Sequence, residues 1–301
     1  MFSFQYPVGA RQSCRINDDW ALNACLSAAS RNRDVALKPI LFTLGDFSLH
    51  TFGVLVALGF MAGLWVASRN AVRAGFNGEF IYDLAPWLIG GGLVGARILY
   101  VISYWDRDFA GKPLGEIFAV WRGGLVFYGG LIGATVLALV RLRMLKQPVW
   151  RVADCLAPSI ALGHVFGRLG CLANGCCYGR PTEAPWAIRY PRGHETFPLA
   201  ALTPTAVHPA QLYEAALNLA FFGALLWLFR RRRFDGQVFA VYLIGYAFIR
   251  TVAELFRGDY SQQSAPLAGV FTPGQTTSAL ILAVGVSLWW WLRNQPARAQ
   301  S

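Results

Sequence analysis

The sequence has 301 residues, of which 55% are hydrophobic and only 14% are charged, and its formal net charge is +11. Soluble domains are about 25% charged, so this composition excludes an ordinary soluble fold and indicates an integral membrane protein. The positive charge does not indicate a nucleic-acid partner, because the basic residues lie mostly in short loops between apolar runs, where they set membrane orientation.

Residues 1–37 differ from the rest of the chain. Their polar and apolar residues are mixed, with scattered arginines, and no apolar core follows a basic start as in a signal peptide. We expect either a disordered tail or a start codon assigned too far upstream, with true translation beginning near residue 35. The membrane domain is expected over 38–295, and 296–301 as a cytoplasmic tail.

Seven apolar segments follow, each long enough to cross about 30 Å of hydrocarbon. A short turn at Gly45 and Asp46 precedes the first of them. The segments are expected at about 48–68, 84–104, 124–141, 153–173, 209–229, 237–256 and 273–292. The sequence therefore predicts an all-α integral membrane protein, a seven-transmembrane helix bundle.

The charges in the loops predict the topology of this bundle. The loops after the first, third, fifth and seventh segments carry twelve Lys and Arg residues, and the loops on the other side carry seven. The positive-inside rule places the first set, and the C-terminus, in the cytoplasm. The longest connection, at about 174–208, then lies outside. Because loops of this length are often functional or small substructures, we expect a compact cap over the outer mouth.

Three arginines, Arg97, Arg168 and Arg250, lie at or near hydrocarbon depth. A charge there is costly and is by default a functional-site hypothesis. Arg250 and Glu254, four residues apart on one helix face, can form a structural ion pair. The functional alternative is an anion site, because the planar guanidinium suits phosphate. We expect spare positive charge that a phosphorylated ligand, such as a phospholipid headgroup, would neutralise.

Two further motifs are ambiguous. His208, Gln211 and Glu214 are spaced three residues apart at the start of the fifth segment, and form either a polar helix entry or a cluster facing the same cavity as Arg168. Tyr128, near the start of the third segment, is preceded by Gly123 and Gly124 and followed by Gly129 and Gly130. These glycines serve close helix packing, or they let a lipid approach the backbone.

The chain has six cysteines, with no Cys-x-x-Cys pair and no standard zinc spacing, so the sequence gives little support for a metal. Cys171, Cys176 and Cys177 allow three interpretations. They are buried apolar filler, or Cys171 forms a disulfide with Cys176 or Cys177 on the oxidising outer side, or the thiols relay a proton in catalysis.

Several short motifs occur in a fixed order along residues 39–293. They include Gly95-Ala96-Arg97, Gly123-Gly124…Phe127-Tyr128-Gly129-Gly130, Gly167-Arg168-Leu169-Gly170, His208-Pro209…Gln211-Leu212-Tyr213-Glu214, and Ile249-Arg250…Glu254-Leu255-Phe256-Arg257. Each motif alone is weakly specific, but their ordered combination resembles the phosphatidylglycerol–prolipoprotein diacylglyceryl transferase family.

This resemblance implies an enzyme of lipoprotein maturation in the bacterial cytoplasmic (inner) membrane, with its N-terminus outside. A diacylglyceryl group passes from phosphatidylglycerol to the thiol of the lipobox cysteine in a prolipoprotein signal peptide, and glycerol phosphate is released. The implied partners are phosphatidylglycerol, prolipoproteins and the lipid bilayer, with no nucleic acid. No metal or soluble cofactor is implied.

The resemblance also implies roles for individual residues. Arg168 and Arg250 bind the phosphate and stabilise the leaving group, and Tyr128 or His208 accepts the proton of the thiol. These four are the expected catalytic residues. The expected substrate-binding residues are Arg168 and Arg250 together with Arg97, Tyr246, Glu254, Arg257, Gly129 and Gly179.

The chain departs from the usual family pattern at the position of the candidate base and near the signature arginine. Tyr128 stands where many relatives carry His, and Cys171 and Cys176 stand where an Asn and a Glu are common. These changes are similar to a Gly-Cys-Cys-Tyr-Gly branch of the family. They leave two alternatives, a related phospholipid-headgroup transferase with another acceptor and a non-catalytic lipid-binding paralogue. An anion transporter is disfavoured, because the halves show no repeat.

Overall fold

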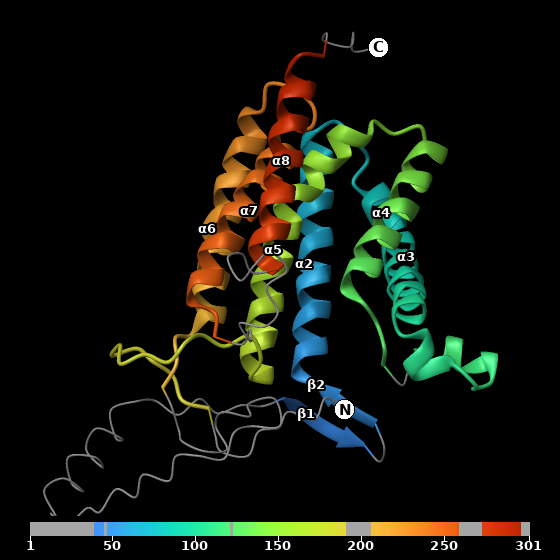
Figure 1. Ribbon diagram of the computed structural model, residues 1–301. Helices are drawn as coiled ribbons and strands as arrows, with labels where there is room; N and C mark the ends of the chain where they lie inside the picture. Colours follow the sequence, from blue (N-terminus) through green and yellow to red (C-terminus); the bar gives the residue numbers. More distant parts are fainter. Residues whose placement is uncertain (1–38, 45–46, 121–122, 191–205, 259–272, 296–301) are drawn as a thin grey trace, which may run out of the picture.

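The computed structural model describes residues 39–44, 47–120, 123–190, 206–258 and 273–295. The expected tails at 1–37 and 296–301 lie outside these residues. Within them, seven helices are long and apolar enough to span a membrane, which confirms the predicted bundle (Figure 1). They are α2 (Thr51–Arg73), α3 (Glu79–Ser103), α4 (Phe127–Met144), α5 (Val149–Asn174), α6 (Ala210–Arg231), α7 (Gln237–Phe256) and α8 (Pro273–Arg293).

A β-hairpin precedes the first spanning helix. Strands β1 (Ile40–Leu44) and β2 (Phe47–His50) are antiparallel, with Ile40 opposite His50 and Thr43 opposite Ser48. The first span begins at Thr51, three residues after the expected start near residue 48. His50 has extended backbone angles and precedes the first helical residue, Thr51.

The centre of the bundle is α5, which packs against α2, α6 and α7. Small residues such as Ala67 of α2 and Ala157 of α5 are fully buried in this core. Asp154 of α5 is also fully buried, and it accepts hydrogen bonds from the backbone N–H groups of Gly236 (2.8 Å) and Phe239 (2.9 Å). These donors belong to the first turn of α7, where N–H groups lack helical partners. Asp154 therefore fixes α7 to α5.

Helices α3 and α4 form a pair that contacts the rest of the bundle only sparsely (Figure 1). Glycines let the two backbones touch, since a Cβ on Gly91 or Gly133 would collide with the facing backbone. A π-helical turn, η1 (Trp105–Phe109), and a 3₁₀ turn, η2 (Leu114–Phe118), connect them. This arrangement is typical of small-residue packing between membrane helices.

The described part of the expected cap, 175–190 and 206–208, is compact. Isolated β-bridges join Pro181 and Ile188 to Val207, and Ile188, Tyr190 and Val207 form a small buried cluster. Burial raises the pKa of Tyr190 to about 12. The connection thus has a core of its own at the end of α5, where Figure 1 shows it in yellow-green below the helices.

Candidate functional site

A network of four charged side chains crosses the bundle between α5, α6 and α7. The Glu214 carboxylate of α6 forms an ion pair with the Arg168 guanidinium of α5, with an N–O distance of 3.0 Å. Its second oxygen lies 3.9 Å from the Arg250 guanidinium of α7. Arg250 also pairs with Glu254, one turn along its own helix, at 3.0 Å. The carboxylates are nearly fully buried, whereas the Arg168 side chain is 20% exposed. Glu214 therefore holds the two arginines of separate helices beside each other.

The charges of this network correct one expectation from the sequence. Spare positive charge was expected around the arginines, but two carboxylates balance Arg168 and Arg250. The predicted Arg250–Glu254 ion pair is present. Glu214 was absent from the expected site residues, although its shared face with His208 and Gln211 was noted. The interpretation that this face reaches Arg168 is confirmed for Glu214.

A glycine of α8 closes the network on one side. A Cβ placed on Gly274 would lie 2.7–2.9 Å from the carboxylate atoms of Glu254. Such contacts are too short for real Cβ atoms, so any larger residue would displace a carboxylate that already pairs with Arg250. Gly274 therefore sets the position of Glu254.

Aromatic rings lie next to the arginines. His164 of α5 and Tyr246 of α7 stack, with centroids 5.1 Å apart. Tyr246 is within electrostatic range of Arg168, Arg250 and Tyr128. Tyr128 is 56% exposed in the first turn of α4. Tyr246 therefore lies beside the helix segments that carry the arginines, and Tyr128 is exposed at the start of α4.

His208 lies in a different group of side chains, at the junction of the cap and α6. Its Nδ1 atom is 3.1 Å from the hydroxyl of Tyr213, and its ring packs edge-to-face on Phe256. Trp186 of the cap donates a hydrogen bond to the same hydroxyl. The structure thus places His208 among aromatic residues at the junction of the cap and α6.

Gly179 and Arg257 connect the cap to the helices. The Gly179 N–H donates to the His208 carbonyl (3.1 Å), and Gly179 pairs with Arg257 in an antiparallel bridge. A Cβ on Gly179 would collide with His208. Arg257 is also within electrostatic range of Arg168. Gly179 therefore acts through backbone packing, and Arg257 brings a further positive charge toward the network.

Arg97 and Gly129 have structural surroundings in the α3–α4 pair. Arg97 donates to the carbonyls of Ile117 and Glu116 (both 2.7 Å), Gly123 (2.8 Å) and Gly124 (3.0 Å). These bonds hold the connection between the two helices.

Gly129 faces Gly95 of α3, where a side chain would collide with backbone. An apolar groove of about 520 Å³, lined by residues of both helices including these two glycines, lies along the pair. Its apolar walls suit hydrocarbon, so Arg97 and Gly129 shape this region through the backbone.

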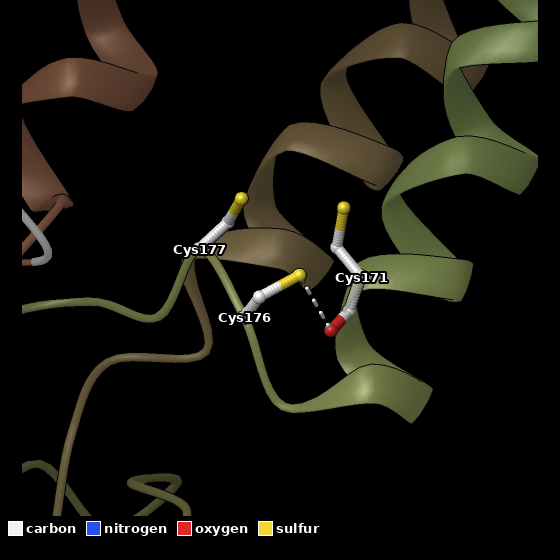
Figure 2. A group of neighbouring side chains, drawn as sticks. All are labelled: Cys171, Cys176 and Cys177. Carbon is white, nitrogen blue, oxygen red and sulfur yellow. Dashed lines mark hydrogen bonds between the residues drawn. The ribbon is translucent and has the colours of Figure 1, made fainter. Parts of the chain in front are cut away.

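Three cysteines gather where α5 ends. The Sγ atoms of Cys171, Cys176 and Cys177 all lie within 4.8 Å of one another (Figure 2). All three are free thiols of intermediate exposure. Cys155 is also free, but it is fully buried in the core of the bundle. The apolar-filler interpretation suits Cys155 better than these three.

Comparison with known proteins adds independent information. The family model described as prolipoprotein diacylglyceryl transferase matches residues 39–291. A phosphatidylglycerol–prolipoprotein diacylglyceryl transferase of Legionella pneumophila (strain Paris) is 33% identical over 258 residues, covering 84% of this chain and 96% of the relative. Proteins of the same name from Mannheimia succiniciproducens and Synechococcus elongatus are 36% and 34% identical, covering 82% of this chain and 90% and 85% of those relatives.

Proposed function

Because the chain belongs to the prolipoprotein diacylglyceryl transferase family, we propose that it transfers the diacylglyceryl group of phosphatidylglycerol to a prolipoprotein thiol. The acceptor is the lipobox cysteine of the signal peptide. The main support for a phosphate site here is that Glu214 pairs with both Arg168 and Arg250, which lie on different helices.

The two arginines bind the phosphate of phosphatidylglycerol. A guanidinium has five N–H donors in a planar fork, so Arg168 can bind phosphate oxygens as well as the Glu214 carboxylate. The 20% exposure of the Arg168 side chain gives a ligand access. Arg257 is a third guanidinium within electrostatic range of Arg168, and it raises the positive potential that favours an anion.

In the reaction, the acceptor sulfur attacks the glycerol carbon that bears the phosphate. The C–S bond forms, the C–O bond breaks, and the electron pair leaves on glycerol phosphate. Negative charge therefore grows on the phosphate oxygens next to Arg168 and Arg250. Preorganised donors at such a position stabilise the transition state, typically by about 3–4 kcal/mol for one donor.

The thiol must lose its proton before or during attack. Tyr128 is the proposed proton acceptor, because it is exposed at the start of α4 and lies within electrostatic range of Tyr246 beside the arginines. His208 remains the second candidate, acting through its hydrogen bond to Tyr213. Tyr246 and Glu254 position the arginines, and Gly129, Gly179 and Arg97 position the surrounding backbone.

The lipid enters from the bilayer between helices, with an acyl chain along the apolar groove of α3 and α4. The protein is a multi-pass membrane protein. We place it in the bacterial inner membrane with its C-terminus in the cytoplasm, because the basic loops lie on that side. The Cys cluster and the cap then face outward, where exported prolipoproteins arrive.

The test is transfer of radiolabelled phosphatidylglycerol to a lipobox peptide by the full chain in membranes. Arg168→Ala and Arg250→Ala are expected to abolish labelling, whereas Arg143→Ala, a matched change at an exposed arginine of α4, should retain it. Full transfer by Arg168→Ala or by Arg250→Ala would refute the proposed site. Headgroup release without peptide labelling would identify a transferase with another acceptor.

A further inference from the structure

The end of α5 brings Cys171 and Cys176 together by a local backbone motif. Gly175 has a left-handed conformation (φ +72°), and the Cys176 N–H donates to the Cys171 carbonyl at 3.1 Å. Gly175 donates to the Leu172 carbonyl at the same distance. In this type of helix end, the side chains at the positions of Cys171 and Cys176 contact each other. The Cys-x₄-Cys spacing around Gly175 therefore predicts paired thiols.

The third thiol is placed by a less common conformation. Cys177 has φ +62°, which is sparsely populated by residues other than glycine. Figure 2 shows the three sulfur atoms around one space, with Cys171 on the helix and Cys176 and Cys177 on the loop.

Gln211 of α6 holds the loop that carries Cys176. Gln211 is 1% exposed, and its Nε2 atom donates to the Cys176 carbonyl and to the Tyr190 hydroxyl, both at 2.8 Å. Its Oε1 atom is buried and lacks a hydrogen-bond partner within the described residues. The loop with Cys176 is therefore fixed against α6, and the Gln211 Oε1 atom is a hydrogen-bond acceptor close to this loop.

We propose that Cys171, Cys176 and Cys177 form a binding site for a thiophilic divalent cation, Zn²⁺, that keeps a fourth coordination position open. Three thiolates bound to one zinc ion lie about 3.8 Å apart, because the Zn–S distance is about 2.3 Å in tetrahedral geometry. The three sulfur atoms, within 4.8 Å of one another, need only small shifts to reach this arrangement. A disulfide would use two of them and leave the third without a role.

The charge of the surroundings suits such a site. One zinc ion with three thiolates carries a net charge of −1, and Arg168 lies three residues before Cys171, on the same part of α5. Cys171 and Cys177 are within electrostatic range of its guanidinium. The loaded cluster therefore lies beside a positive charge, which Arg168 shares with Glu214.

An open fourth position gives the cation a chemical role, and this part of the inference rests on the proposed function. The acceptor thiol binds zinc as a thiolate, since a coordinating thiol is deprotonated. Its proton would pass through Tyr128 to solvent, and the bound sulfur would then attack the glycerol carbon while the C–O bond to the phosphate breaks. The cation would thus prepare the nucleophile in a chain whose candidate base is Tyr128.

Metal binding is tested on the reduced full chain in detergent, with zinc per chain measured by plasma mass spectrometry after loosely held metal is removed. We expect one zinc ion per chain. Cys171→Ser, Cys176→Ser and Cys177→Ser should each weaken zinc binding at least about 100-fold, the upper range for outer-shell changes. Cys155→Ala, which removes a buried thiol from the core of the same helix, is the matched control and should not change binding.

A second measurement needs no variant. Zinc should protect Cys171, Cys176 and Cys177 of the wild-type chain from alkylation, and leave the labelling of Cys14 and Cys25 unchanged. Absence of stoichiometric zinc in the reduced chain, or equal alkylation of the three thiols with and without zinc, would overturn the site.

The open position is tested with Co²⁺ as a spectroscopic probe. A lipobox peptide with its cysteine should change the visible spectrum of the cobalt-loaded chain, and the same peptide with serine should not. Equal spectra with both peptides would overturn the fourth-ligand role. Zinc binding without any lipid transfer would instead contradict the proposed function, so the two failures are distinguishable.

Discussion

Replacement of Glu214 by Gln is the sharpest perturbation of the charged network. The change keeps the shape of the side chain but removes the charge that Arg168 and Arg250 share at 3.0 and 3.9 Å. Glu254 would remain as the partner of Arg250, and Arg168 would lose its carboxylate. We therefore expect Glu214→Gln to destabilise the protein and to misplace Arg168 in particular.

The magnitude follows from burial. Glu214 is 4% exposed, and removing one partner from a buried ion pair costs about 3–5 kcal/mol. A pair of unit charges about 4 Å apart interacts by about 4 kcal/mol at an effective dielectric constant of 20, which agrees with this range. For catalysis, loss of one oriented donor to the leaving group lowers the rate about 10²- to 10³-fold.

Two measurements check this prediction, thermal unfolding in detergent and the rate of diacylglyceryl transfer to a lipobox peptide. Glu183→Gln, at an exposed carboxylate of the cap, is the matched control and should leave both unchanged. Because Glu214 holds the arginines, we expect the loss to appear in kcat more than in the KM for phosphatidylglycerol. Wild-type unfolding temperature and kcat in Glu214→Gln would refute the bridging role.

Three further substitutions test the packing around the site. Gly274→Ala should reduce transfer about as much as Glu254→Gln does, because its Cβ displaces the Glu254 carboxylate, and equal activity to wild type would contradict this. Arg97→Lys should lower the unfolding temperature, since it loses most of four bonds to carbonyls and bonds to charged groups contribute about 1.5–3 kcal/mol each. Gly129→Val should destabilise by about 1–3 kcal/mol through overpacking, measured by the same unfolding assay, and unchanged stability would show that α3 and α4 separate easily.

The spans could be predicted because hydropathy and length act over about twenty residues and tertiary contacts rarely override them. The helix ends were less accurate, with α3 beginning at Glu79 and not near residue 84. The β-hairpin was missed because Ile40–Leu44 and Phe47–His50 are too short to show a strong alternation. Short strands are defined by their partner, which the local pattern does not contain.

The site could be predicted only where its signal lies within one segment of the sequence. Arg168 and Arg250 were identified from their cost in hydrocarbon, a property of one residue in one segment. The role of Glu214 depends on which helix lies next to α6, and periodicity gives a face but not its neighbour. The cysteine cluster had a local signal, because Gly175 ends α5 and a C-terminal glycine predicts contact between Cys171 and Cys176.

Helices α5 and α6 each carry one residue of the phosphate site and one residue of the proposed thiol site, three positions apart. On α5, Cys171 follows Arg168 by three residues, and on α6, Gln211 precedes Glu214 by three residues. Gln211 holds the cysteine loop and Glu214 holds the arginines. Three residues rise about 4.5 Å along a helix, so both helices offset the two sites by nearly one turn. A displacement then requires the glycerol carbon to lie between a leaving phosphate at the arginines and a nucleophilic sulfur at the cysteines.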